Sequence, residues 1–77
     1  MSHVGKGHCD TNDGYFDIPD AIAKLNVEVC KQKCMVDKKC RAIAHANGQC
    51  SGYTGPCRNI IIPDEEALKH VTYVKGR

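Results

Sequence analysis

Residues 29–42 read VCKQKCMVDKKCRA, and this stretch decides how the chain folds. Cys30 and Cys34 are four positions apart, so on a helix they share one face with Val27. Asn26 can cap a helix that begins at Val27. The stretch therefore predicts an amphipathic helix whose buried face carries two cysteines. Because cysteines on one helix face cannot easily bond to each other, each must find a partner elsewhere in the chain.

The chain has 77 residues and six cysteines, a combination typical of small secreted proteins. A domain of this size buries too little apolar surface to be stable by packing alone, and disulfides compensate for this. An even number of cysteines favours complete pairing, although the residues by themselves do not choose among the possible pairings. We therefore expect three disulfides and a secreted, extracellular protein. The cysteines are Cys9, Cys30, Cys34, Cys40, Cys50 and Cys57.

Zinc binding is the alternative use of these cysteines, because thiolates and the four histidines could build a tetrahedral site in a reducing compartment. Structural zinc usually takes two closely spaced cysteine pairs, and here only Cys30 and Cys34 approach one. We therefore expect no metal site and no cofactor.

Short strands and turns are expected around the helix. The Asn47-Gly48 step predicts a tight hairpin turn between two of the strands. Residues 20–25 have helical propensity but are too few to form a stable helix alone, and residues 65–69 form a further polar, helical turn. The expected strands cover residues 15–18, 40–45, 49–53, 60–62 and 70–74, of which 60–62 should be buried.

The predicted fold class is α+β: a small disulfide-rich domain in which one main helix packs on an antiparallel β-sheet. Residues 1–8 are polar, contain glycine and lack periodicity, so we expect a flexible N-terminal lead-in. Residues 9–77 should form the single disulfide-stapled domain.

Three features of the cysteine pattern belong together. They are the Cys30 and Cys34 pair on the predicted helix, Cys40 at the start of a strand after a short polar loop, and Gly48-Gln49-Cys50 in the hairpin. Together they resemble the PAN/apple domain family, and the segment 71–75 is similar to the family's last strand. The resemblance covers most of the predicted domain and implies a PAN/apple-like module.

The resemblance also implies a disulfide pairing, since the family bonds its two helix cysteines in a nested way. The implied bonds are Cys34–Cys40, Cys30–Cys50 and, from the two cysteines that remain, Cys9–Cys57. The last bond departs from the family pattern. Apple domains join cysteines near their two ends, whereas Cys57 lies well before the end of this chain.

The charge of the chain excludes some partners and suggests others. A formal net charge of +2 is low for a dedicated nucleic-acid binder, and no nucleic-acid-binding motif is present. No stretch approaches the roughly 18 apolar residues of a membrane span. A basic cluster in and after the helix can bind a sulfated glycan or an acidic protein, although lysines also simply solvate an outer helix face. The cluster consists of Lys31, Lys33, Lys38, Lys39 and Arg41.

No enzyme and no catalytic residue are expected. His45 and His70 could act as bases, but no serine or free-thiol motif accompanies them. We expect a non-catalytic, secreted and monomeric module. PAN/apple domains bind proteins and carbohydrates, so the resemblance implies that it recognises an extracellular protein or glycan.

The alternative is a secreted toxin-like effector or protease inhibitor, a role for which small disulfide scaffolds are common. Such a protein would act through an exposed, rigid loop. The loop at residues 52–56 between two cysteines is the candidate, and Tyr53 would be its anchor.

Overall fold

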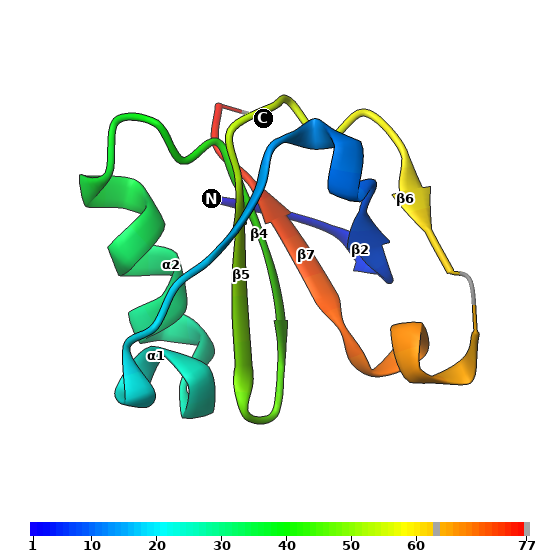
Figure 1. Ribbon diagram of the computed structural model, residues 1–77, viewed down its shortest axis with the longest axis horizontal. Coiled ribbons are helices and arrows are strands. Elements are labelled where there is room, and N and C mark those ends of the chain that lie inside the picture. The colour runs from blue at the N-terminus through cyan, green and yellow to red at the C-terminus, as the bar shows by residue number, and fades with distance from the viewer. Residues whose placement is uncertain (63, 77) are drawn as a thin grey trace.

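A five-stranded antiparallel sheet lies at the centre of the computed structural model, which describes residues 1–62 and 64–76 (Figure 1). Its strands follow one another in the order β1, β7, β4, β5, β3, and a separate two-stranded sheet pairs β2 with β6. The strands are β1 (Ser2–Lys6), β2 (His8–Cys9), β3 (Tyr15–Asp17), β4 (Ala42–Ala46), β5 (Gln49–Tyr53), β6 (Ile60–Ile61) and β7 (Val71–Val74).

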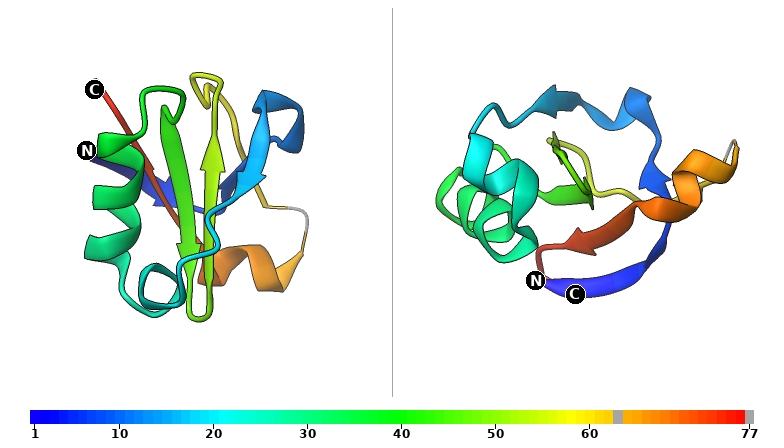
Figure 2. Two further views of the ribbon diagram at one scale, coloured as in Figure 1. Left: turned by 60° about the vertical axis from the view of Figure 1, so that its left-hand side comes forward. Right: turned by 90° about the horizontal axis from the view of Figure 1, so that it is seen from below.

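The α-helices lie together on one side of the five-stranded sheet, whereas β2 and β6 lie on the other (Figure 2). The main helix begins at Val27 as predicted, because the Asn26 side chain accepts a hydrogen bond from the Glu28 N–H. One main helix on an antiparallel sheet confirms the predicted fold class. The helices are α1 (Ala21–Leu25), α2 (Val27–Val36) and the short 3₁₀ helices η1 (Thr11–Asp13) and η2 (Glu65–Lys69).

The sheet separates two small cores, because side chains alternate between its faces. Toward the helices, Ile43 of β4 and Cys50 of β5 pack with Cys30 and Cys34 of α2. On the opposite face, a second core gathers small residues of β4 around one aromatic ring. Its buried members are Cys9, Ala42, Ala44, Tyr53, Cys57 and Val74.

All six cysteines are bonded, and the bonds hold the parts of both cores together. Cys30–Cys50 joins α2 to β5, Cys34–Cys40 closes the loop after α2, and Cys9–Cys57 joins β2 to the segment between β5 and β6. These are the three pairs that the resemblance to the PAN/apple family implied. Two bonds lie on the helix side of the sheet and one on the opposite side.

The N-terminal segment differs from the expected flexible lead-in. Residues 2–6 form β1, an edge strand that pairs with β7 from Ser2 opposite Val74 to Lys6 opposite Val71. The Thr72 hydroxyl also donates a hydrogen bond of 2.7 Å to the Gly7 carbonyl. Edge pairing of this kind leaves little hydrophobic alternation in the sequence, so periodicity did not reveal the strand.

The isoleucine strand is shorter and less buried than predicted. Only Ile60 and Ile61 form β6, and they are half-buried, whereas Ile62 is exposed. β6 pairs with the two-residue strand β2 rather than with the main sheet, so neither face of β6 is covered by a full layer.

Asp20 caps α1 and ties it to α2. One carboxylate oxygen accepts hydrogen bonds from the N–H groups of Ile22 and Ala23, and the other lies 3.2 Å from the Lys33 ammonium. The Ala23 hydrogen bond and then Lys33 hold the pKa of the Asp20 carboxyl below its ordinary value. The folded state therefore favours the ionised form. Its contribution to stability is present above the ordinary pKa and is lost as the pH falls through the lowered one.

We expect Asp20→Ala to lower the midpoint of thermal unfolding at neutral pH by about 4 to 8 °C. Asp20→Asn keeps a capping oxygen but loses the charge, so its effect should be smaller. Circular dichroism melts at neutral and acid pH provide the measurement. The difference between the parent protein and Asp20→Asn should shrink as the pH falls through the lowered pKa of the carboxyl, and a constant difference at both pH values would contradict the role of the carboxylate.

Candidate functional site

The predicted basic cluster is divided in the structure rather than gathered on one surface. The Lys31 ammonium lies 3.0 Å from the Glu28 carboxylate and 4.6 Å from the centre of the Tyr73 ring. Lys33 is paired with Asp20, as described above. The charges of these two lysines are therefore partly neutralised by ion pairs within the protein.

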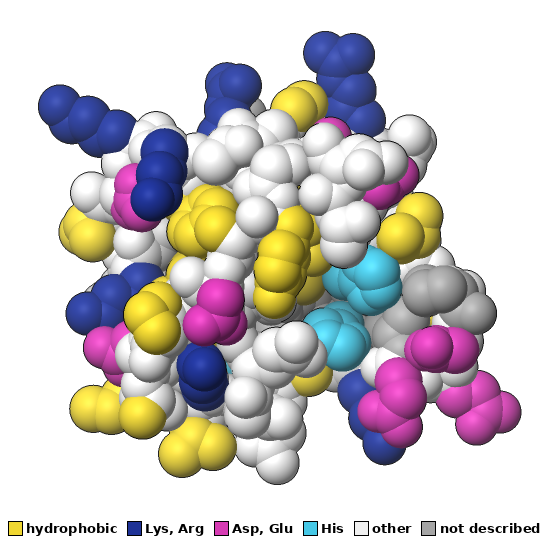
Figure 3. Space-filling view, in the orientation of Figure 1, with side chains coloured by type: hydrophobic (Ala, Val, Ile, Leu, Met, Phe, Trp, Pro, Cys, Tyr) yellow, Lys and Arg dark blue, Asp and Glu magenta, His cyan; other side chains and the backbone are white. Residues whose placement is uncertain are grey.

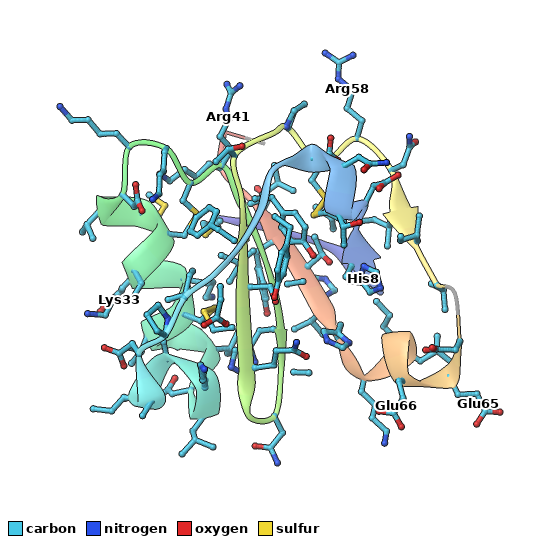
Figure 4. All side chains as sticks on the ribbon, in the orientation of Figure 1. His8, Lys33, Arg41, Arg58, Glu65 and Glu66 are labelled. Carbon is cyan, nitrogen blue, oxygen red and sulfur yellow. A yellow bond between two sulfur atoms is a disulfide. The ribbon has the colours of Figure 1, made fainter. Side chains whose placement is uncertain are left out.

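The remaining basic residues belong to one end of the molecule. Lys39 lies over the Phe16 ring at 5.0 Å, while Lys38 and Arg41 are exposed. Arg41 and Arg58 extend from the same end, whereas Glu65 and Glu66 lie at the opposite corner (Figure 4). Arg58 was missed by sequence analysis because it follows Cys57, far along the chain from the cluster.

This basic end offers little concave surface. The nearest hollow, about 220 Å³, is lined by Lys33 and Lys39 but also by Asp17 and Asp37. Its charges are mixed, and this weakens the attraction for an anionic ligand that the sequence suggested.

The segment 52–56 does not present the anchor expected of an inhibitory loop. Gly52 and Tyr53 belong to β5, and the Tyr53 side chain is only 2% exposed. Burial, followed by the nearby Tyr15 and Asp13, raises the pKa of Tyr53 to about 12. The prediction of Tyr53 as an exposed contact is therefore wrong, because alternation along β5 turns this ring into the second core.

A cleft that combines tyrosine, histidine and acidic side chains lies on the side of the sheet away from the α-helices. It is a cleft of about 320 Å³, which we call the histidine cleft. Figure 3 shows histidine side chains next to each other on this face, with hydrophobic groups beside them and acidic groups at the lower right. The lining residues are His8, Thr11, Tyr15, Gln49, Ser51, Tyr53, Asp64, Glu66 and His70.

Strand geometry places the aromatic part of the histidine cleft. Gln49, Ser51 and Tyr53 are alternate residues of β5 and so point to one face. Tyr15 of β3 is paired with Tyr53, and the two rings meet edge to face with centroids 5.8 Å apart. Tyr53 is buried, but Tyr15 is 45% exposed. The accessible Tyr15 ring is therefore held in place by its contact with the buried Tyr53 ring.

The two histidines come from distant parts of the chain. His8 belongs to β2 and His70 directly precedes β7, and their rings meet edge-on at 5.7 Å. The Nδ1 atom of His8 lies 2.8 Å from the Cys9 carbonyl oxygen, which holds the ring in place. If this nitrogen carries the proton, the other nitrogen of the neutral ring is an acceptor.

His70 joins η2 to β5 across the cleft. Its Nδ1 lies 3.3 Å from the Glu66 carbonyl oxygen, and its Nε2 lies 3.0 Å from the Gln49 side-chain oxygen. A neutral imidazole has a single N–H, so it can donate to only one of these oxygens. The Gln49 contact becomes a hydrogen bond when the ring donates to it, or when the amide turns to present its NH₂ group. The His70 and Gln49 side chains can therefore offer a ligand either a hydrogen-bond donor or a hydrogen-bond acceptor.

The two histidines that sequence analysis considered as bases lie on opposite faces of the sheet. His45 of β4 is buried on the helix side, where its Nε2 lies 3.1 Å from the Ala23 carbonyl oxygen. His70 lies in the histidine cleft. They cannot act on one substrate, and the structure gives His45 a role in holding α1 against the sheet.

Comparisons of the chain with protein-family models, curated proteins and solved structures found no match. Kinship with the PAN/apple family therefore stays a hypothesis based on the cysteines.

Within residues 1–62 and 64–76, no three histidine, cysteine, aspartate or glutamate side chains gather as a metal site requires. No helix in the described part of the chain is long and apolar enough to cross a membrane.

Proposed function

We propose that this protein is a non-catalytic extracellular module that binds carbohydrate in the histidine cleft. The observation that carries the proposal is the exposed Tyr15 ring beside a small polar cleft. A pyranose ring has a flat apolar face and a rim of hydroxyl groups. Its face can lie on an aromatic ring while its hydroxyls exchange hydrogen bonds with nearby polar side chains.

The polar lining suits a neutral sugar. Gln49 and His8 can donate or accept hydrogen bonds, and the carboxylates of Asp64 and Glu66 can accept them from hydroxyl groups. Among the described residues, this lining includes no lysine or arginine, so it offers neither of these cations to an anionic sugar. We therefore expect neutral hexoses or 2-acetamido sugars rather than sialic acid or sulfated sugars.

The extracellular setting is supported by the disulfides. Three bonds in so short a chain are typical of proteins that fold in an oxidising compartment. Their pairing is also the one expected of a PAN/apple-like module, and that family binds carbohydrates as well as proteins. The exposed aromatic ring favours carbohydrate here.

A binding role fits the cleft better than catalysis. All six cysteines are bonded, so no thiol is available as a nucleophile. Ser51, the hydroxyl closest to such a role on β5, is only 3% exposed.

A glycan array with neutral, sialylated and sulfated sugars, followed by calorimetry, tests the proposal. We expect binding to neutral glycans that falls about tenfold or more in Tyr15→Ala, because the stacking surface is lost. Tyr15→Phe should retain most of the affinity, because it keeps the ring. Leu25→Ala is the matched control, since Leu25 is an exposed apolar side chain of α1 on the other side of the sheet.

Three results would overturn the proposal. One is the absence of binding to any glycan by a folded protein. The second is binding that Tyr15→Ala leaves unchanged. The third is binding confined to sulfated glycans and abolished by Lys38→Ala and Arg41→Ala, which would move the site to the basic end.

A further inference from the structure

We infer that the histidine cleft is the first of two adjoining subsites and that the carbohydrate is therefore a chain of at least two sugar residues. This inference rests on the proposed function. A second cavity of about 480 Å³ borders the histidine cleft and shares Gln49, Glu66 and His70 with it. Its other lining residues are Ala46, Asn47 and Lys69.

A contact between His70 and Gln49 lies at the boundary between the cavities. The Nε2 atom of His70 lies 3.0 Å from the Gln49 side-chain oxygen, and both residues line both cavities. This pair is solvent-exposed rather than buried, so a ligand can pass over it. The glycosidic linkage between two sugars would lie at this boundary, where the pair can offer a donor or an acceptor.

Size supports two subsites. Sites for small molecules usually measure about 300–1,000 Å³, and the histidine cleft alone lies at the lower limit of that range. Adding the neighbouring cavity brings the groove well inside it. A monosaccharide would leave the second cavity filled only with water, whereas a disaccharide would use both.

The chemistry of the second subsite differs from that of the first. Among the described residues, its lining includes no tyrosine or phenylalanine, and it is polar along the hairpin turn and η2. Lys69 and Glu66 form an exposed ion pair at 3.2 Å, which places a donor and an acceptor group side by side. Asn47 adds an amide from the turn between β4 and β5. The second sugar would thus be held by hydrogen bonds at its hydroxyls rather than by stacking.

Asn47 and Lys69 can be changed without disturbing the backbone. In the hairpin turn the positive φ of 83° belongs to Gly48, so Asn47→Ala keeps a permitted conformation. Lys69 is exposed, and Lys69→Met keeps its stem while removing the charge. The double variant Asn47→Ala with Lys69→Met therefore alters the second subsite and leaves Tyr15 in place.

The test is calorimetric titration with β-linked series of glucose, galactose and N-acetylglucosamine, each from one to four residues. We expect affinity to rise about tenfold from one residue to two, because the second sugar gains two or three hydrogen bonds, and to change little thereafter. The double variant should lose the gain of the disaccharide. Asn47→Ala alone leaves the Lys69–Glu66 ion pair intact, so it should bind the monosaccharide as the parent does and lose part of that gain.

The outcomes separate this inference from the proposed function. Equal affinity for one and four residues, or a disaccharide gain that survives in the double variant, overturns the second subsite and leaves the proposed function intact. No binding to any member of the three series, combined with a negative glycan array, overturns both.

Discussion

We expect the double variant C30A/C50A to lose most of its stability, because this disulfide is the covalent connection between α2 and the sheet. The bond closes a loop with a sequence separation of 20, and losing that constraint lowers the free energy of unfolding by about 3 kcal/mol. The total free energy of unfolding of a domain of this size is only a few kcal/mol. Denaturant titration followed by far-UV circular dichroism measures the effect.

The matched control for C30A/C50A is C34A/C40A. Its bond lies in the same core but closes a separation of only 6, so the same reasoning gives about 2 kcal/mol. The helix should also stay bonded to β5 in this control. If C34A/C40A proves the less stable of the two, the importance of the connection between helix and sheet is contradicted.

Sequence analysis predicted the parts of the fold whose signals are local. The start of α2 follows from Asn26 and the spacing of two cysteines, and the hairpin follows from Asn47-Gly48. Each of these signals involves residues a few positions apart, where backbone preferences and side-chain periodicity act directly. These elements are therefore found where the sequence predicted them.

The histidine cleft could not be predicted in this way, because long-range pairing assembles it. His8, Gln49 and His70 are far apart in the sequence, and each carries an ordinary surface signal on its own. The alternation of Gln49, Ser51 and Tyr53 predicts that they share a face, but it does not say which residues lie opposite. β1 escaped prediction for the same reason, since only its partner β7 defines it.

For the basic cluster, the sequence predicted a single charged surface that the folded chain does not have. Five cations lie within a short stretch of the sequence, and the Glu28–Lys31 pair follows from their i,i+3 spacing on one helix. The sequence does not show that Lys33 of α2 is paired with Asp20, the residue that caps α1. Charge density along a chain overestimates charge density on a surface whenever ion pairs form between elements. Arg58 shows the complementary error, since it joins the basic end only after the chain folds.

We expect the largest loss of stability from C9A/C57A, together with a specific loss of the histidine cleft. The bond has a sequence separation of 48, so its removal lowers the free energy of unfolding by about 4 kcal/mol. Cys9 also adjoins His8 in β2, a strand of only two residues that pairs with an equally short β6. Without the bond, His8 stays anchored to β7 through β1 and Gly7, but the covalent link from β2 to the segment after β5 is lost.

Two measurements on C9A/C57A separate these effects, both made with a stabilising osmolyte so that enough protein is folded. Amide hydrogen exchange should show protection lost in β2 and β6 but kept in α2, β4 and β5. Glycan affinity per folded molecule should fall at least tenfold in C9A/C57A and stay unchanged in C34A/C40A, whose bond lies on the other side of the sheet. Unchanged glycan affinity in folded C9A/C57A would mean that the bond is not needed to hold the histidine cleft and affects stability alone.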